Sequence, residues 1–263
     1  MRELKNLKGV TNNIILGDCL EIIPEFPECS IDLVITDPPY GVNFENNHYD
    51  DSAESVFNIY HNWLKQIFRI LKDTCHLYIF IPTLETDKWI SGVKAFFKFN
   101  NLIGTQVYQT NISSNIKNNF TFDLQLIIYA SKGKPRKFND VDWIPTSKSW
   151  LKDKRNPEPR LYTYQYPSYI DHRIERANTK PNKQYKRFHP NEKNPNLIRH
   201  WIEMSSEPDD IVLDPFCGSA STAVAAWQTN RKFIMIEKNV DFYKLANKRL
   251  KKLMSQKKIT QFR

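Results

Sequence analysis

A strand-like apolar run that is stopped by two prolines is the feature of this sequence that most constrains its fold. Residues 31–36 read IDLVIT, and Asp37, Pro38, Pro39 and Tyr40 follow directly. Proline fixes φ near about −65° and donates no backbone hydrogen bond, and a residue before proline is pushed toward extended geometry. The chain therefore leaves the strand in an extended turn that presents carbonyl oxygens, a carboxylate and a phenol ring. In open α/β sheets the carboxyl ends of strands are where ligands bind.

Hydrogen-bond acceptors beside an aromatic ring fit a planar base that carries an exocyclic amine. The oxygens can accept the N–H groups of the amine, and the ring can lie against the face of the base. For the segment DPPY taken alone, a proline-rich turn with a purely structural role is an equally good interpretation. The rest of the chain has to decide between the two.

Strand-like and helix-like segments alternate on both sides of an irregular middle region, which is typical of a parallel sheet covered by helices. The expected strands are residues 13–18, 31–37, 75–81, 101–110, 122–130, 211–216 and 232–237. The expected helices are residues 56–71, 85–97, 196–204, 221–227 and 241–254. In the first helix apolar residues recur at i, i+3, i+4 and i+7, so one of its faces packs on the sheet. The pattern predicts an α/β fold.

Residues 132–188 carry the whole excess of positive charge. The chain has a formal net charge of +9 at pH 7. This segment holds 15 Lys and Arg residues against 6 Asp and Glu residues, whereas the rest of the chain is balanced. It is too aromatic to be a disordered linker throughout. A basic lobe on a neutral body is typical of proteins that bind nucleic acid; a solvated lysine-rich loop is the alternative.

No stretch of the sequence approaches the roughly 18 apolar residues that a membrane helix needs. The first residues lack the apolar core of a signal peptide, so we expect a cytoplasmic protein without membrane contact. The four cysteines are scattered along the chain and form no metal-ligand spacing. We therefore predict neither a metal site nor a disulfide framework.

A turn of small residues between the strand at 211–216 and the helix at 221–227 is the second functional pattern. Residues 213–222 read LDPFCGSAST, and backbone amides at such a helix start can face a ligand that glycine allows to approach closely. About twenty residues later the next strand ends in Glu237, which is placed to accept two ribose hydroxyls. Together these features predict a site for a nucleoside-containing cofactor, although a packing turn would explain the turn alone.

These motifs resemble those of DNA amino-methyltransferases of the beta group, in which a DPPY motif precedes an F-x-G-x-G motif. The matching segments are 17–20 (GDCL), 37–40 (DPPY), 189–194 (HPNEKN), 213–222 (LDPFCGSAST) and 235–250 (MIEKNVDFYKLANKRL). Two positions depart from the pattern. Ala220 replaces the last glycine of F-x-G-x-G, which we expect to be tolerated if φ is negative there. Asn194 separates Lys193 from Pro195, where the family often has lysine followed directly by proline.

The resemblance implies a Rossmann-like mixed α/β sheet of the S-adenosylmethionine-dependent methyltransferase type, with a small irregular target-recognition lobe. It divides the chain into a catalytic half (1–131), a basic target-recognition insert (132–188) and a cofactor-binding half (189–263). The implied cofactor is S-adenosylmethionine, and the implied partner is double-stranded DNA. Family members are often homodimers.

The resemblance also implies roles for individual residues. The catalytic set is Asp37, Pro38, Pro39 and Tyr40, in which Asp37 and the Pro38 carbonyl would accept hydrogen bonds from the target amine. Tyr40 would stack on the base, a contact worth about 1–3 kcal/mol. The cofactor-binding set is Asp18, Cys19, Asp37, Lys193, Asp214, Phe216, Gly218, Ser219 and Glu237.

Within the cofactor-binding set, Glu237 would hold the ribose hydroxyls and Asp18 would accept from the adenine amine of the cofactor. Phe216 and Gly218 would shape the methionine pocket. Asp214 would lie near the amino group of the cofactor. Lys193 is a weaker candidate for this pocket, and a surface charge at a helix start is its alternative interpretation.

The expected reaction is direct methyl transfer to the exocyclic amine of a base that is flipped out of the duplex. No covalent nucleophile is needed, and we interpret Cys217 as a packing residue. Family members that have a DPPY motif mostly methylate adenine, so transfer to the N6 amine of adenine is expected. The alternatives are the N4 amine of cytosine, an RNA or protein substrate, and a DNA-binding protein with an inactive methyltransferase fold.

Overall fold

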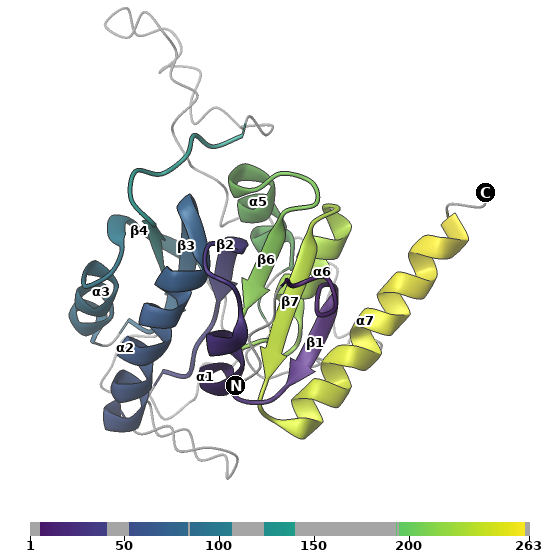
Figure 1. Cartoon of the computed structure of the whole chain (residues 1–263), viewed down its shortest axis with the longest axis horizontal. Coiled ribbons are helices and arrows are strands. Elements are labelled where there is room, and N and C mark those ends of the chain that lie inside the picture. Colours follow the sequence, from purple (N-terminus) through teal and green to yellow (C-terminus); the bar gives the residue numbers. More distant parts are fainter. Residues whose placement is uncertain are drawn as a thin grey trace, which may run out of the picture.

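The computed structural model of the chain describes residues 6–40, 53–83, 85–106, 124–139, 193 and 195–260 (Figure 1). The strands are β1 (Asn13–Leu16), β2 (Ile31–Thr36), β3 (Leu71–Ile81), β4 (Lys98–Gln106), β5 (Leu124–Ser131), β6 (Ile211–Asp214) and β7 (Lys232–Glu237). The helices are α1 (Cys19–Ile22), the 3-10 helix η1 (Ile23–Glu25), α2 (Ala53–Ile70), α3 (Thr86–Lys94), α5 (Pro195–Ser205), α6 (Ser221–Gln228) and α7 (Val240–Thr260). The predicted recognition lobe lies almost entirely outside the described residues, apart from its first residues up to 139.

The seven strands of the described part form one mixed sheet in the order β1-β7-β6-β2-β3-β5-β4. The first five strands in this order run parallel to one another, whereas β5 is antiparallel to both β3 and β4. The mixed α/β sheet implied by the resemblance is confirmed, whereas the parallel sheet predicted from the alternating pattern is wrong at the edge formed by β5 and β4. From β2 the chain continues outward to β3, and from β6 it continues to β7 on the other side. The boundary between β2 and β6 is therefore a topological switch point, where open sheets form a ligand crevice.

Helices cover both faces of this sheet, and each face has its own apolar core. One core joins the sheet to α1, α2 and α3, and the other joins it to α5, α6 and α7. Along β2 the side chain of Val34 belongs to the first core, whereas Leu33 and Ile35 belong to the second. Because β2 is buried on both faces, its sequence is a continuous apolar run rather than an alternating one.

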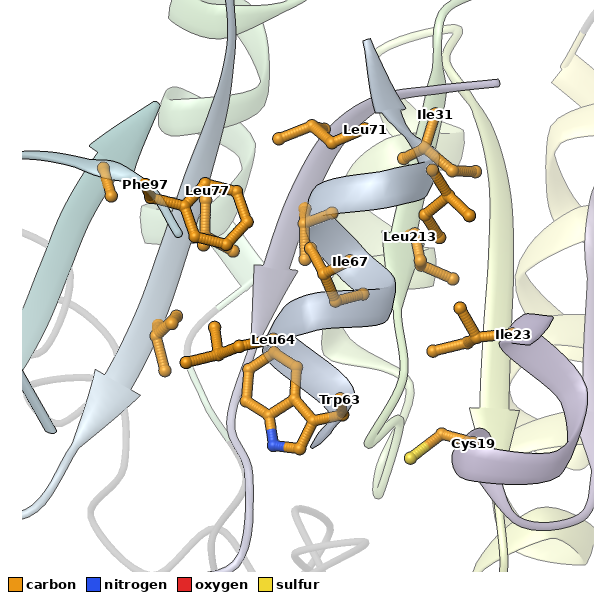
Figure 2. Packing of buried hydrophobic residues seen from close by; sticks show 14 of the residues in the cluster. Cys19, Ile23, Ile31, Trp63, Leu64, Ile67, Leu71, Leu77, Phe97 and Leu213 are labelled. Atoms are coloured by element: carbon orange, nitrogen blue, oxygen red, sulfur yellow. The ribbon is translucent and has the colours of Figure 1, made fainter. Parts of the chain in front are cut away.

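Helix α2 packs on the sheet through the apolar stripe predicted from its spacing. Figure 2 shows Trp63, Leu64 and Ile67 of this helix in one apolar cluster with Leu71 and Leu77 of β3, and all five side chains are at most 1% exposed. Complete burial of a leucine or isoleucine side chain contributes roughly 1.5–3 kcal/mol. The apolar stripe therefore determines which face of α2 packs on the sheet.

Most expected elements are present, with shifted ends. Strand β3 begins at Leu71 rather than at residue 75, and α7 extends to Thr260 rather than to residue 254. The short helix α1 was not predicted; it begins after Asp18, whose side chain caps it by accepting a hydrogen bond of 2.9 Å from the amide of Leu20. None of the described helices is both long and apolar enough to span a bilayer.

Candidate active site

The two sequence motifs meet at the carboxyl edge of the sheet, on its two central strands. Strand β2 leads into Asp37, strand β6 ends in Asp214, and the two strands are hydrogen-bonded neighbours. A hydrogen bond of 2.9 Å from the Thr36 hydroxyl to the Asp214 carboxylate joins their ends. The DPPY segment and the small-residue turn, 178 positions apart in the chain, therefore belong to one site.

The turn after β6 is tied to the acidic end of β7. The backbone N–H of Gly218 donates a hydrogen bond of 2.8 Å to one carboxylate oxygen of Glu237, and the N–H of Asn239 donates one of 2.8 Å to the other. A carboxylate offers about four acceptor positions, so each oxygen of Glu237 can still accept one more hydrogen bond. Burial raises the pKa of Glu237 above its usual value. The geometry fits a pair of vicinal hydroxyls.

Asp18 lies beside this acidic end, because the N–H of Gly17 bonds to the backbone carbonyl of Glu237 at 2.9 Å. One oxygen of Asp18 caps α1, and the other forms an ion pair of 2.8 Å with Lys238. Partial burial works against ionisation, but the Lys238 ammonium and the Leu20 amide outweigh it and lower the pKa of Asp18. Asp18 is therefore an ionised acceptor next to Glu237.

Asp214 is buried, with both of its carboxylate oxygens used inside the protein. One oxygen accepts from Thr36 and from the amide of Phe216 at 3.1 Å, and the other accepts from the Thr222 hydroxyl at 2.8 Å. Burial raises the pKa of Asp214 to about 7, although these hydrogen bonds oppose the shift. The carboxylate thus links β2, β6 and α6. Its predicted contact with the amino group of a cofactor stays a prediction.

The backbone at Ala220 does not meet the condition of a negative φ under which alanine was expected to be tolerated. Ala220 has φ 62° and ψ 31°, in the left-handed region, and it precedes the first residue of α6. For a residue with a side chain this conformation costs roughly 1–2 kcal/mol. Alanine therefore keeps the backbone shape that glycine would adopt without strain, and its methyl group packs in the core.

Phe216 and Ser219 flank Gly218 in the same turn. The ring of Phe216 meets the buried Trp63 edge-on, with 5.6 Å between ring centroids. The carbonyl of Ser219 accepts a hydrogen bond of 2.8 Å from Arg249 of α7. These contacts hold the turn between α2 and α7. The predicted roles of Phe216 and Ser219 in cofactor binding stay predictions.

In the DPPY segment the carboxylate of Asp37 is the centre of a polar cluster. One oxygen accepts a hydrogen bond from the Tyr40 hydroxyl, and the other forms an ion pair of 2.9 Å with Lys193. Burial, followed by the nearby charge of Asp37, raises the pKa of Tyr40 well above its usual value, so its hydroxyl stays protonated. The ring of Tyr40 stands edge-on to Trp89, with 6.4 Å between ring centroids. Pro38 is buried, whereas Pro39 and Tyr40 are half-buried.

Lys193 lies against the DPPY segment, and its predicted place in the methionine pocket stays a prediction. Its ammonium contacts Asp37, the Tyr40 hydroxyl at 3.3 Å and the side-chain oxygen of Gln125 at 3.2 Å. It also lies 5.1 Å from the centroid of the Phe80 ring. Sequence reasoning did not select Gln125 or Phe80, because neither belongs to a recognisable motif.

Comparison with known proteins agrees with this arrangement. The sequence model of a family described as DNA methylase matches residues 31–248, which include the DPPY segment, the small-residue turn and Glu237. The chain belongs to this family of DNA methylases. It is therefore an S-adenosylmethionine-dependent DNA methyltransferase of the type that modifies N6 or N4 amines.

The methylase is 26% identical over 262 residues to the type II methyltransferase M2.MboI of Moraxella bovis, with 90% of this chain and 86% of that protein covered. Its fold is similar to that of M1.HpyAVI in complex with SAM, with a TM-score of 0.60, 22% identity and coverage of 90% and 98% of the two chains. It is also similar to the PvuII DNA methyltransferase (cytosine-N4-specific), with a TM-score of 0.63, 20% identity and coverage of 92% and 90%.

The thiols closest to the site of the methylase are poor nucleophiles. Cys19 and Cys217 are both 5% exposed and pack in the two cores. Burial raises the pKa of Cys19 to about 12 and that of Cys217 well above its usual value. A thiol reacts as its thiolate, so neither group is activated. The interpretation of Cys217 as a packing residue is confirmed. The predicted contact of Cys19 with the cofactor stays a prediction.

Proposed function

We propose that this methylase transfers the methyl group of S-adenosylmethionine to the exocyclic N6 amine of adenine in double-stranded DNA, and that it is a member of the beta group. The observation that carries the proposal is the hydrogen bond between Thr36 and Asp214. It joins the residue before the acceptor carboxylate of Asp37 to the start of the cofactor turn. The amine and the methyl donor therefore have binding groups on adjacent strand ends.

The proposed cofactor site consists of the residues around the ends of β1, β6 and β7. Glu237 would accept the two ribose hydroxyls with the acceptor positions that Gly218 and Asn239 leave open. Asp18 would accept from the adenine amine of the cofactor. Phe216, Gly218 and Ser219 would border the methionine part. When bound, the sulfonium of S-adenosylmethionine supplies an activated methyl group.

The proposed role of the protein in the transfer is to orient the amine and to balance its charge. Asp37 and the carbonyl of Pro38 accept its two N–H bonds, which keeps the nitrogen lone pair free for the methyl group. As the bond forms, positive charge grows on the nitrogen, and the carboxylate of Asp37 stabilises it. Tyr40 bounds the base pocket with its ring. Correct orientation of two reactants is a large part of such rate enhancements.

The proposed recognition of DNA is assigned to the insert at 132–188. Its excess of 9 positive charges over a balanced remainder favours binding of phosphates. Binding that depends on phosphate contacts weakens steeply as salt rises. A homodimer of the methylase is part of the same proposal, since family members are often dimers.

The identity of the base is tested by product analysis. The purified protein is incubated with labelled S-adenosylmethionine and unmethylated genomic DNA, and the DNA is digested to nucleosides. Label in N6-methyldeoxyadenosine supports the proposal. Label in N4-methyldeoxycytidine keeps the mechanism and changes the base, and absence of label despite DNA binding contradicts an enzymatic function.

A further inference from the structure

The ammonium of Lys193 is surrounded by hydrogen-bond acceptors and aromatic rings of the catalytic motif. It lies 2.9 Å from an oxygen of Asp37, 3.2 Å from the oxygen of Gln125 and 3.3 Å from the hydroxyl of Tyr40. The ring centroids of Phe80 and Tyr40 are 5.1 Å and 5.7 Å away. The side chains of Lys193 and Asp37 are only 19% and 21% exposed. This cluster of Asp37, Tyr40, Phe80 and Gln125 is here called the acceptor cage.

The orientation of Gln125 is fixed by its own contacts. Its side-chain nitrogen donates a hydrogen bond of 2.7 Å to the carbonyl of Ile81 and a longer one of 3.3 Å to the carbonyl of Leu126. Because both carbonyls can only accept, the amide oxygen of Gln125 has to point to Lys193. The side-chain oxygen of Gln125 therefore has a fixed position in the acceptor cage. No sequence motif predicts this position.

The groups that hold the ammonium are those that an exocyclic amine needs. An amine of a base brings two N–H donors on a flat ring, and the cage offers carboxylate and amide oxygens beside two aromatic rings. During methyl transfer the nitrogen gains positive charge next to Asp37. An ammonium on the same carboxylate would repel that charge and would take up its acceptor oxygen. The ammonium of Lys193 and the reacting amine therefore compete for the carboxylate of Asp37.

We propose that Gln125 is a further acceptor for the target amine at Asp37, and that Lys193 occupies the acceptor cage until the flipped base displaces the ammonium. This inference rests on the proposed function, because it assumes that the substrate is an amine of a base. Lys193 keeps the half-buried carboxylate of Asp37 paired while the acceptor cage holds no base. Gln125 helps to bind the base when Lys193 has left.

The test replaces the side chain of Lys193 and returns a fragment of it. Lys193→Ala leaves room for n-propylammonium, which carries the missing carbons and the ammonium. Calorimetry should detect n-propylammonium binding to Lys193→Ala and none to the wild type, with sodium chloride at equal concentration as the control. The double variant Lys193→Ala/Gln125→Leu should bind it at least about threefold more weakly, because one acceptor is lost. No binding to Lys193→Ala would overturn the proposal. These readouts need no turnover, so they stay separate from the assay of the proposed function.

Steady-state kinetics of Lys193→Ala distinguish two roles of Lys193, a group that the base displaces and a group that assists methyl transfer. For Lys193→Ala the KM for DNA should fall by about threefold or more, because a larger fraction of the enzyme is ready to accept the base. In the presence of n-propylammonium the variant should be inhibited competitively with DNA. Its affinity for S-adenosylmethionine, measured without DNA, should stay within about twofold of the wild type. Recovery of a lost kcat by n-propylammonium, or a large loss of cofactor affinity, would overturn the proposal.

Discussion

The hydroxyl of Thr36 donates a hydrogen bond of 2.9 Å to the buried carboxylate of Asp214. Thr36 directly precedes the acceptor carboxylate of the DPPY segment, and Asp214 begins the turn that leads to Gly218. The same carboxylate also accepts from Thr222 in the first turn of α6 at 2.8 Å. One buried acid thus holds together the strand that leads into the DPPY segment and the turn that follows β6.

The burial of Asp214 should make stability depend on pH. Its folded pKa is raised by burial to about 7 from an ordinary value of 3.8, so the folded state binds the proton more tightly than the unfolded state. The free energy of unfolding should then fall as pH rises from about 4 to about 7, and this contribution should be constant above pH 7. Asp214→Asn should remove this part of the dependence.

Urea unfolding of both proteins at pH 5 and pH 8 measures the effect. Between these values the wild type should lose on the order of 2 kcal/mol relative to Asp214→Asn. Thr36→Val is a second variant, which keeps the carboxylate and removes one donor, and it should cost about 1 kcal/mol at either pH. Equal pH profiles for the wild type and Asp214→Asn would show that the carboxylate is not held neutral by burial.

Replacement of Glu237 by glutamine should weaken cofactor binding more than it weakens the fold. A glutamine side chain has one oxygen, so it cannot accept from Gly218 and Asn239 together and still accept from two hydroxyls. Affinity for S-adenosylmethionine should fall by about tenfold or more, which corresponds to at least about 1.4 kcal/mol. Calorimetric titration gives this value directly.

The matched control for this change is Glu207→Gln, which removes the same charge from an exposed residue before β6. Its affinity for the cofactor should equal that of the wild type. If both variants bound the cofactor equally well, the ribose contact assigned to Glu237 would be wrong.

A methyl group at Gly92 should destabilise the protein. A Cβ added there would lie 2.4 Å from Cε1 of Tyr60, whose hydroxyl bonds to the carbonyl of Trp89 at 2.8 Å. Overpacking of this kind costs typically 1–3 kcal/mol, so Gly92→Ala should lower the melting temperature by several degrees. Gly9→Ala is the control, since nothing lies within 4 Å of its added Cβ. An unchanged melting temperature for Gly92→Ala would show that Tyr60 can move without cost.

Thiol labelling should find one reactive cysteine, away from the catalytic motif. Of the four cysteines, all of which are described, only Cys29 is exposed. Ellman's reagent should titrate one thiol rapidly in the folded protein and all four after unfolding. Cys29→Ser should remove the rapid phase and leave methyl transfer unchanged. Rapid labelling of a second thiol that abolishes transfer would indicate a reactive cysteine in the site.

The sequence predicts the frame of the fold better than the contacts of the site. Strand β7 has the expected bounds because its apolar residues lie between polar ends. The start of β3 was missed because Lys72, Asp73 and Thr74 are polar and Thr74 has φ 65°, so no apolar period marks this part of the strand. At Ala220 the alanine favours a negative φ, but the tight turn into α6 imposes a positive one.

The site was predicted where a motif stands at the end of a strand. Gly218 and Glu237, both selected from the sequence, contact each other because β6 and β7 are neighbours in the sheet. The position of Lys193 was not predictable, since its contact with Tyr40 spans 153 residues and includes the insert. Gln125 carries no local signal at all; only the antiparallel pairing of β5 with β3 brings it to this edge.

The most direct test of the account is methyl transfer by Asp37→Ala, measured beside the wild type with labelled S-adenosylmethionine and unmethylated DNA. The wild type should place label in N6-methyldeoxyadenosine. The variant should transfer at least about 1,000-fold more slowly, because it loses both the orientation of the amine and the balance of its charge. Cofactor affinity of the variant, measured by calorimetry, should stay close to that of the wild type. Turnover that survives in Asp37→Ala would contradict the role of this carboxylate and, with it, the central claim.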